Sequence, residues 1–194
     1  MDRIAIFASG SGTNAERIIS HFSHHPSIAV SLILSNNPDA YVLERAKNHR
    51  IPSFVFNRRQ LADSMIIPEL LKNAGITFIA LAGFLWLVPA NLLQAYPGRI
   101  VNIHPALLPK YGGKGMYGMK VHEAVILAGD KESGISIHFV NEQYDEGDII
   151  LQARCPVLPG DTPETLASRI HELEYEHYPR VIEELLTARS SLLI

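Results

Sequence analysis

"RIAIFASGSGTNA", residues 3 to 15, begins with a short apolar run and ends in a cluster of small polar residues. The apolar run predicts a strand, and the segment after Asn14 predicts a helix. Between them, Gly10, Gly12 and Ala15 match the loose dinucleotide-binding pattern G-x-G-x-x-A. A strand, a glycine-rich turn and a helix in this order are typical of an open α/β sheet.

The rest of the chain alternates apolar runs with helix-like segments. Further strands are predicted at Ile28–Leu34, Ser53–Phe56, Thr77–Ala82, Arg99–His104, Gly134–Val140 and Asp148–Val157. Helices are predicted at Tyr41–His49, Ser64–Ala74, Pro89–Tyr96, Val121–Gly129 and Thr162–Ala188, the last with Pro163 in its first turn. The last two strands leave no room for a helix between them, so we expect them to pair antiparallel.

This order of elements predicts the fold class. We expect an α/β protein with a Rossmann-like, open and mostly parallel sheet flanked by helices, and an antiparallel C-terminal strand pair. We also expect residues 1–194 to form a single domain, which is an ordinary size for one. In such sheets ligands bind beyond the carboxyl ends of the strands, which directs attention to the loops after Phe7, Ala82 and His104.

The composition excludes several classes of protein. The chain is 47% hydrophobic and carries a formal net charge of −3, so it has no strongly basic surface for nucleic acid. No window approaches the roughly 18 uninterrupted apolar residues of a membrane span, and the N-terminal stretch does not resemble a signal peptide. The single cysteine, Cys155, cannot form an intrachain disulfide and fits a reducing compartment. We therefore expect a cytoplasmic protein without nucleic-acid or membrane partners.

The first loop predicts an anion site. Glycines let the backbone approach a phosphate, the helix N-terminus presents N–H groups, and Ser11, Thr13 and Asn14 add side-chain donors. The alternative is a plain tight turn in which Thr13 or Asn14 caps the helix. A dinucleotide would require an acidic residue at the end of the second strand, where Ser35–Asn37 stand instead. A monophosphate therefore fits this loop better than NAD.

A polar pair lies at the end of an apolar strand. Asn102 and His104 are two residues apart and share one face, and Pro105 keeps His104 extended. The amide can donate to a developing oxyanion and the imidazole can move a proton, although a structural asparagine and a core histidine are the alternative. A nearby carboxylate would raise the pKa of His104. Four acidic residues are candidates, and spacing does not choose among them: Glu142, Asp145, Glu146 and Asp148. The alternative is that these acidic side chains are simply exposed to solvent in a loop.

Six motifs connect these loops to a known family. They are "SGSGTN", "LAGF", "NIHPALLPKY", "HFV", "YDEGDIILQ" and "HELEYEHYP". In this order they closely resemble the phosphoribosylglycinamide formyltransferases, from about residue 3 to about residue 186. The resemblance implies transfer of a formyl group from 10-formyltetrahydrofolate to the amine of glycinamide ribonucleotide, in purine biosynthesis. It implies small-molecule substrates and a monomer or homodimer, and the histidines lack the spacing of a zinc site, so no metal is expected.

The resemblance also assigns roles to residues. Asn102 would bind the oxyanion, His104 would stabilise it and transfer protons, and Asp145 would hold His104 protonated and organise water. Gly12, Thr13 and Asn14 would bind the substrate phosphate. Glu174 would contact the ribose or the amine, with an exposed helical glutamate as the alternative. The implied folate-binding residues are Arg59, Phe84, Leu85, Trp86, Leu87, Val88, Asn141 and Tyr144.

This sequence departs from the family pattern in places. Trp86 stands where many relatives carry an arginine, and the loop Gly112–Met119 is longer than the common type. His122 either closes this loop onto the site or is an exposed helical histidine. Which of Arg58, Arg59 and Gln60 contacts folate is open.

Three other functions share these features. Formyltetrahydrofolate deformylase would use the same three residues but normally carries an additional N-terminal domain. Methionyl-tRNA formyltransferase carries a C-terminal nucleic-acid-binding domain. A nucleotide-binding module without transfer chemistry is the third alternative. The first predicted strand begins at Arg3, and the acidic chain ends with its last predicted helix, so we expect neither additional domain. The missing acidic residue after the second strand argues against an NAD-binding module, and the deformylase and a nucleotide-binding module stay the alternatives.

Overall fold

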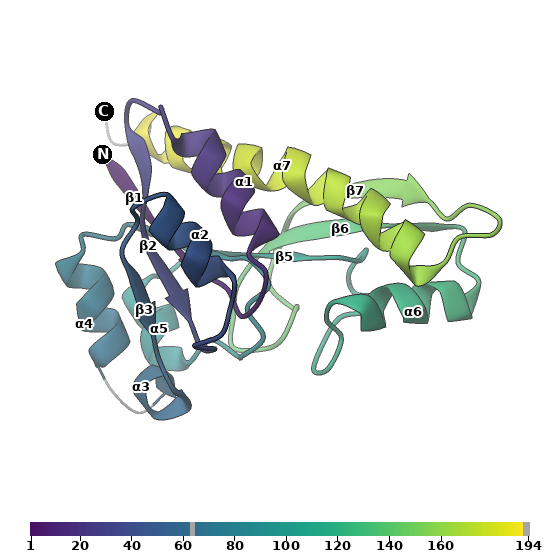
Figure 1. The fold of residues 1–194 in the computed structure, drawn as a ribbon, viewed down its shortest axis with the longest axis horizontal. Coiled ribbons are helices and arrows are strands. Elements are labelled where there is room, and N and C mark those ends of the chain that lie inside the picture. Colours follow the sequence, from purple (N-terminus) through teal and green to yellow (C-terminus); the bar gives the residue numbers. More distant parts are fainter. Residues whose placement is uncertain (63–64, 192–194) are drawn as a thin grey trace.

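The computed structural model describes residues 1–62 and 65–191, with side chains as far as residue 188 (Figure 1). Within this part the strands are β1 (Asp2–Phe7), β2 (Ile28–Ser35), β3 (Ser53–Val55), β4 (Phe78–Leu81), β5 (Ile100–His104), β6 (Glu132–Phe139) and β7 (Ile149–Pro156). They form one 7-stranded sheet in the order β3-β2-β1-β4-β5-β6-β7. β1 to β5 are parallel, whereas β6 and β7 are antiparallel to their neighbours. The predicted fold class is confirmed.

Helices cover both faces of the sheet. They are α1 (Thr13–Phe22), α2 (Val42–Asn48), α3 (Arg58–Ala62), α4 (Ile66–Asn73), α5 (Ala90–Ala95), α6 (Met119–Ala128) and α7 (Pro163–Ser191). Side chains of β1 alternate between two hydrophobic cores, because successive residues of a strand point to opposite faces. Ile4 and Ile6 pack with α1, α2, α6 and α7, while Ala5 and Phe7 pack with α3, α4 and α5. None of the helices described is long and apolar enough to cross a membrane.

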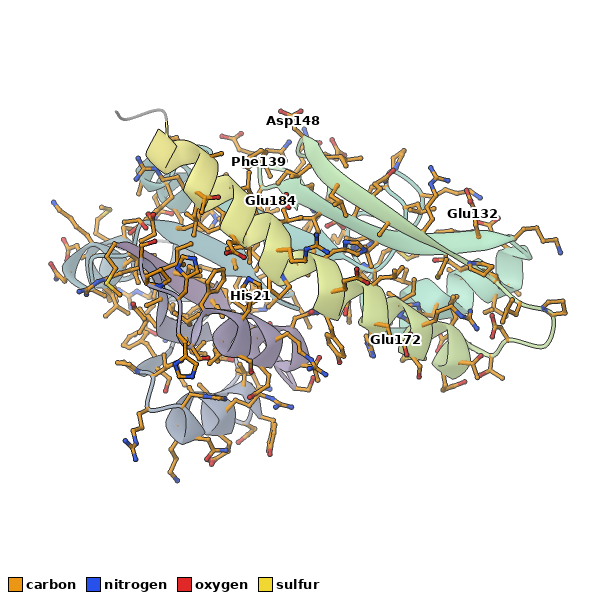
Figure 2. The ribbon with its side chains drawn as sticks, turned by 90° about the horizontal axis from the view of Figure 1, so that it is seen from above. His21, Glu132, Phe139, Asp148, Glu172 and Glu184 are labelled. Carbon is orange, nitrogen blue, oxygen red and sulfur yellow. The ribbon has the colours of Figure 1, made fainter. Side chains whose placement is uncertain are left out.

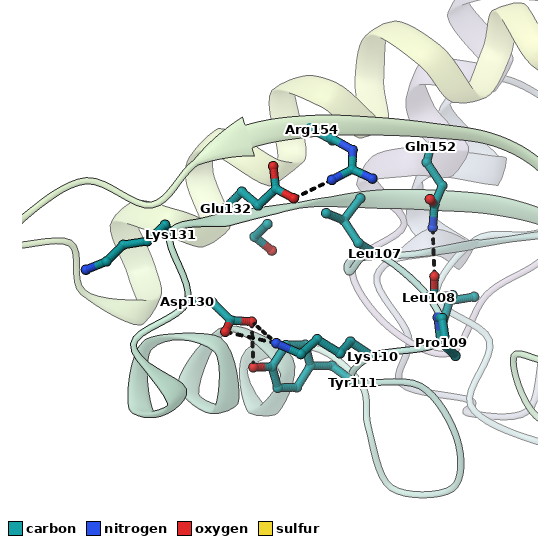
Figure 3. Close-up of a pocket in the computed structure, with 11 residues that line it drawn as sticks. Leu107, Leu108, Pro109, Lys110, Tyr111, Asp130, Lys131, Glu132, Gln152 and Arg154 are labelled. Carbon is teal, nitrogen blue, oxygen red and sulfur yellow. Dashed lines mark hydrogen bonds and ion pairs between the residues drawn. The ribbon is translucent and has the colours of Figure 1, made fainter.

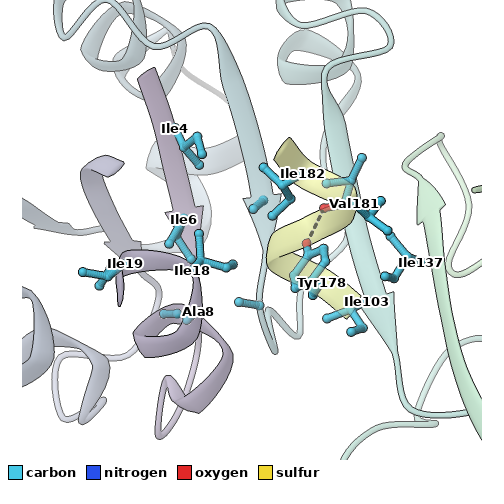
Figure 4. Packing of buried hydrophobic residues seen from close by; sticks show 14 of the residues in the cluster. Ile4, Ile6, Ala8, Ile18, Ile19, Ile103, Ile137, Tyr178, Val181 and Ile182 are labelled. Carbon is cyan, nitrogen blue, oxygen red and sulfur yellow. Dashed lines mark hydrogen bonds between the residues drawn. The ribbon is translucent and has the colours of Figure 1, made fainter. Parts of the chain in front are cut away.

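The long helix α7 is tied to the centre of the sheet by Tyr178. This side chain is fully buried among isoleucines of β1, α1 and β5 (Figure 4). Its hydroxyl lies 2.9 Å from the carbonyl oxygen of Leu81 and 3.2 Å from that of Val101, and it donates to both. Glu174 lies four residues earlier, on the same side of the helix, because i and i+4 positions are neighbours on a helix surface. The core contact of Tyr178 therefore aims Glu174 at the interior.

Most predicted elements agree with the structure to within two residues. The exceptions are α7, which ends at Ser191 rather than Ala188, and α3, which was not predicted. Asn57 and Gln60 cap α3 reciprocally, each backbone N–H donating to the other side chain at 2.9 Å. The motif "NRRQ" carries this signal, but α3 is too short for periodicity to reveal. The predicted start of the next helix at Ser64 lies outside the described residues.

Three strands end level with one another at one edge of the sheet. Phe7 pairs with Leu81, and Leu81 pairs with Asn102. The loops that follow β1 and β4 bond each other: Ser9 N–H donates to the carbonyl of Gly83 at 3.0 Å, and Leu85 N–H donates to Ser9 Oγ at 3.1 Å. The predicted anion loop and the end of β5 are thus brought to the same edge.

The hairpin of β6 and β7 brings a third loop to this edge. Figure 2 shows Phe139 and Asp148 together at one end of the hairpin and Glu132 at the other. Phe139 N–H donates to the carbonyl of Asp148 at 2.9 Å. Gly147 passes so close to the carbonyl oxygen of Phe139 that a Cβ on it would lie 1.7 Å away. Only glycine fits there, and this tight passage leads the loop carrying Asp145 back over the end of β5.

Candidate active site

Asp145 lies between Asn102 and His104. Its Oδ1 accepts from Asn102 Nδ2 at 3.3 Å, and its Oδ2 lies 3.6 Å from His104 Nδ1. Its Oδ2 also accepts the backbone N–H of Gly113 at 2.9 Å. The other three acidic candidates of this loop are exposed. Tertiary structure therefore selects Asp145, which sequence spacing did not, and brings together the three residues predicted to be catalytic.

The backbone of Asp145 is in the left-handed region, with φ of 57°. Aspartate tolerates this region better than most residues, and such strain is often found at functional sites. Burial alone would raise the pKa of this carboxyl. The rings of His138 and His104 and the N–H of Gly113 outweigh burial and hold the pKa of Asp145 below its usual range. Asp145 is therefore a carboxylate at neutral pH.

Asp145 and burial act on the pKa of His104 in opposite directions. Burial lowers the pKa of His104 below its usual value, and this effect exceeds the opposing influences of Asp145 and the Tyr111 carbonyl. The ring is only 4% exposed, so loss of hydration of the imidazolium dominates. His104 Nε2–H donates to the Tyr111 carbonyl at 2.7 Å. Because that carbonyl can only accept, Nδ1 is the basic nitrogen of the neutral ring, and it is the nitrogen next to Asp145.

His138 completes the cluster. It pairs directly with Asn102 across β5 and β6. Its Nδ1 donates to the Phe139 carbonyl at 2.8 Å, which leaves Nε2 to accept from Asn102 Nδ2 at 3.1 Å. Its Nε2 also lies 3.6 Å from Asp145 Oδ1. The contacts of Asn102 Nδ2 with His138 and Asp145 orient its amide.

Ser136 supports the loop that follows the catalytic strand. It is fully buried, and its Oγ donates to the Ala106 carbonyl at 2.7 Å and accepts the Leu108 N–H at 2.9 Å. It pairs with His104 across β5 and β6. Alternation along β6 was visible in the sequence, but the register with β5 was not. Without that register, neither Ser136 nor His138 could be assigned to the catalytic face.

The predicted phosphate loop opens α1. Gly12 precedes the helix in the left-handed region with φ of 69°, and a Cβ on it would lie 2.5 Å from Val42. The alternative in which Thr13 or Asn14 caps the helix is wrong, because the helix begins at Thr13 and no side chain caps it. The N–H groups of the first turn of a helix have no intrahelical partner, which suits this loop to an anion.

Asn14 instead reaches across to α7. Its Nδ2 donates to Glu174 Oε2 at 3.0 Å, while its own Oδ1 is buried without a hydrogen-bond partner. Glu174 is 6% exposed, so the alternative of an exposed helical glutamate is wrong. Burial raises the pKa of Glu174 to about 7, against the opposing hydrogen bond from Asn14. The unpartnered oxygen of Asn14 and the titratable carboxyl form a polar pair that can receive donors of a ligand.

Glu174 should make stability depend on pH. Because its pKa rises from about 4.5 in the unfolded chain to about 7 in the fold, the unfolded state loses its proton first. Stability should therefore fall as pH rises from about 4 to about 8, by about 3 kcal/mol from this group. Glu174→Gln should remove this fall, measured as the difference in urea unfolding between the two proteins at each pH. The exposed Glu172→Gln is the control. A Glu174→Gln protein with the wild-type pH slope would contradict the prediction.

A second region collects part of the predicted folate set. Arg59, Trp86, Leu87 and Tyr144 line a cavity of about 430 Å³, which Arg58 also lines. The Arg58 guanidinium lies 4.6 Å from the centre of the Trp86 ring, a cation–π contact. A cation from α3 therefore stands over the Trp86 ring.

The other predicted folate residues do not join this cavity. Val88 is 4% exposed and belongs to the hydrophobic core. Phe84 packs edge-on against Phe7 at 5.4 Å, also as part of the core. Leu85 and Asn141 are exposed, and the side chain of Asn141 accepts the Gln143 N–H at 2.9 Å in its own turn.

His122 is buried rather than exposed, at 2% exposure. Burial, followed by the charges of His171 and His104, lowers the pKa of His122 to about 4, and its Nδ1 has no hydrogen-bond partner. The loop before it contacts the site through Gly113, as described above. Among the residues that the structure describes, no group of three or more His, Cys, Asp or Glu side chains could hold a metal ion.

Comparison with known proteins agrees with this geometry. A family model described as "Formyl transferase" matches residues 2–182. The chloroplastic phosphoribosylglycinamide formyltransferase of Arabidopsis thaliana is 42% identical, over 96% of this chain and 66% of the plant protein. The phosphoribosylglycinamide formyltransferase of Haemophilus influenzae is 39% identical, over 99% of this chain and 91% of the relative.

A solved structure is similar over the same extent. Glycinamide ribonucleotide transformylase 1 from Geobacillus kaustophilus superposes with a TM-score of 0.87 at 40% identity, over 96% of this chain and 99% of that one. The order of the strands, the Asn102–His104–Asp145 cluster at the carboxyl edge and the match along nearly the whole sequence agree with one another. The chain belongs to the formyl transferase family.

Proposed function

We propose that this protein transfers the formyl group of 10-formyltetrahydrofolate to the amine of glycinamide ribonucleotide, giving the N-formyl product and tetrahydrofolate. One observation carries the proposal. At the edge where β1, β4 and β5 end, Asp145 lies between a partly exposed amide and a buried neutral imidazole, next to an anion loop. The relatives that bear this activity in their names match this chain along nearly its whole length.

The phosphate and ribose of the acceptor suit the first loop and α7. Gly12 and Thr13 offer backbone N–H groups at the start of α1 for the phosphate. The buried Oδ1 of Asn14 can accept a hydroxyl or an amine of the substrate, and Glu174 can accept a second donor. A ligand that satisfies Asn14 Oδ1 would remove an unpartnered buried atom, which favours binding.

The catalytic residues suit formyl transfer. The amine of the acceptor forms a bond to the formyl carbon, and the carbonyl oxygen becomes an oxyanion. Asn102 Nδ2 can exchange its long 3.3 Å hydrogen bond to Asp145 for a hydrogen bond to this oxyanion. One preorganised donor of this kind is worth about 10² to 10³ in rate.

Proton transfer is the second task. As the new carbon–nitrogen bond forms, the amine must lose a proton, and the folate nitrogen must gain one when its own bond to the formyl carbon breaks. His104 Nδ1 can take the first proton, because the ring is neutral. The imidazolium then lies beside the Asp145 carboxylate, 3.6 Å away, and returns the proton to the leaving nitrogen. General acid–base catalysis of this kind contributes about 10² to 10⁴.

We also propose that the cavity beside Trp86 receives the carboxylate-bearing tail of the folate. Arg58→Ala should then raise the KM for 10-formyltetrahydrofolate by about tenfold or more, since a hydrogen bond to a charged group is worth about 1.5 kcal/mol or more. The kcat and the KM for glycinamide ribonucleotide should stay near wild type in the same steady-state assay. The exposed Arg180→Ala is the control, and an unchanged folate KM in Arg58→Ala would disprove the contact.

One assay tests the proposed function. The protein is incubated with 10-formyltetrahydrofolate, with and without glycinamide ribonucleotide, and tetrahydrofolate and formylated product are followed. We expect both products only when the acceptor is present. Release of tetrahydrofolate without the acceptor would indicate a deformylase, and no release in either case would indicate a binding module. A single domain, a cytoplasmic location and a monomer or homodimer remain part of the proposal; light scattering tests the last.

A further inference from the structure

The catalytic pair depends on a short backbone segment, Tyr111–Gly113. The carbonyl of Tyr111 accepts His104 Nε2–H at 2.7 Å, and the N–H of Gly113 donates to Asp145 Oδ2 at 2.9 Å. The first bond decides which nitrogen of His104 is basic, and the second orients the carboxylate. A shift of this segment would move both catalytic side chains together.

Side chains of the same segment are held from a different part of the fold. Tyr111 has a φ of 56°, a left-handed conformation that a bulky residue rarely adopts without support. Its hydroxyl donates to Asp130 Oδ2 at 2.8 Å, and Lys110 Nζ donates to Asp130 Oδ2 and Oδ1 at 2.8 and 2.9 Å. Figure 3 shows Lys110 and Tyr111 converging on Asp130 at the border of a cavity of about 330 Å³.

Asp130 itself is fixed by a rigid helix end. Gly129 is left-handed with φ of 68°, and its N–H donates to the Ile126 carbonyl at 3.1 Å. Asp130 N–H donates to the Val125 carbonyl at 3.4 Å. These two bonds form a Schellman motif, which ends α6 in a defined conformation. β6 begins two residues later at Glu132, so Asp130 stands between two regular elements.

The charges favour the same arrangement. The hydrogen bonds from Lys110 and Tyr111 lower the pKa of Asp130, and Asp130 raises the pKa of Lys110. The Lys110 side chain is 65% exposed, so its ion pair adds little to stability by itself. The bond from Tyr111 is different, because Tyr111 also contacts His104 through its backbone. This hydrogen bond fixes the position of the Tyr111–Gly113 segment rather than stabilising the fold as a whole.

We propose that Asp130 is a positioning residue, which acts through Tyr111 to place the Tyr111 carbonyl and the Gly113 N–H against His104 and Asp145. The effect of Asp130 on turnover rests on the proposed function, but its effect on the tautomer of His104 does not. The two can therefore be tested separately.

The test uses Tyr111→Phe, which removes a single oxygen, and Asp130→Ala. Nitrogen-15 NMR of the imidazole rings reads the His104 tautomer without any substrate. We expect the wild type to show the Nε2–H form, and both variants to show mixed tautomers. In the formyl-transfer assay kcat should fall by about tenfold to a hundredfold, with the KM values little changed, because a small misplacement of catalytic groups acts on kcat.

A matched control comes from the same cavity. Arg154 also lines it, and its guanidinium bonds Glu132, which lies outside the Tyr111–Gly113 segment. Arg154→Gln should therefore keep both the His104 signal and kcat. A second arm combines Asp130→Ala with His104→Ala. If Asp130 acts through His104, its loss should lower the residual rate by less than about twofold in that background.

The outcomes separate cleanly. A wild-type His104 signal in both Tyr111→Phe and Asp130→Ala would overturn the proposal, whatever happens to kcat. If Asp130→Ala does not fold, as judged by thermal unfolding, Tyr111→Phe decides alone. If the wild type shows no formyl transfer, the proposed function fails, and the NMR comparison still decides whether Asp130 positions His104.

Discussion

His104→Ala is expected to lower kcat for formyl transfer by about 10² to 10⁴, the range that a general acid–base catalyst contributes. The ring is the buried base next to the end of β5, and its Nδ1 faces the Asp145 carboxylate at 3.6 Å. Because the substitution removes a ring from a buried position, thermal unfolding must show that the variant is folded. Steady-state assays with both substrates then give kcat and the two KM values.

The surface histidine His24 provides the matched control. Its side chain is exposed in the turn before β2, and His24→Ala should keep kcat within about twofold of wild type. A folded His104→Ala protein with kcat within tenfold of wild type would remove His104 from the proton transfer.

The pH profile tests the same residue. In the proposed mechanism the neutral ring is the active form. The value of kcat/KM should therefore fall as pH decreases through the pKa of His104 in the substrate-free enzyme. Burial lowers that pKa, so the acid limb should lie below 6.5, the ordinary value for histidine. A fall in kcat/KM as pH rises through the pKa of His104 would instead support the protonated His104 that the family resemblance implied.

Asp145→Asn should have the second largest effect, a loss of about 10² to 10³ in kcat. Asparagine has nearly the same shape and tolerates the φ of 57°, so the loop should keep its path. The charge beside His104 is lost, which destabilises the imidazolium that forms during transfer. The acid limb of the pH profile should move to still lower pH, because Asp145 raises the pKa of His104.

Asp148→Asn is the control for this substitution. It removes an exposed carboxylate three residues farther along the same loop and should leave both kcat and the profile unchanged. If Asp145→Asn lowers kcat but leaves the acid limb in place, Asp145 does not act through His104, and its role would be confined to orienting Asn102.

The pKa values of two carboxyls of this site are shifted in opposite directions. Burial raises the pKa of both, yet the pKa of Asp145 is low and that of Glu174 is raised to about 7. The difference lies in their partners, because Asp145 is surrounded by two imidazoles, an amide and a backbone N–H. Glu174 has one hydrogen bond, from Asn14. Environment, rather than residue type, therefore makes one a fixed anion and the other a group that titrates near neutral pH.

Sequence reasoning reached the fold and part of the site. Short apolar runs in alternation with helical segments predicted the strand and helix order, since periodicity is a local property of the chain. The family resemblance pointed to Asn102, His104 and Asp145, which the structure brings into contact. Part of the predicted folate set lines one cavity together with Arg58, whereas Val88 and Phe84 pack in or against the core.

The sequence by itself determined the class of sheet, the loops at its carboxyl edge and the residues that mark the family. Tertiary structure alone decided the register that sets His138 against Asn102 and the contact of Asp130 with Tyr111. It also decided that His104 is neutral, because desolvation depends on how segments distant in the chain enclose the ring. Local patterns report which face of an element a residue occupies, but contacts and hydration across elements exist only once the chain has folded.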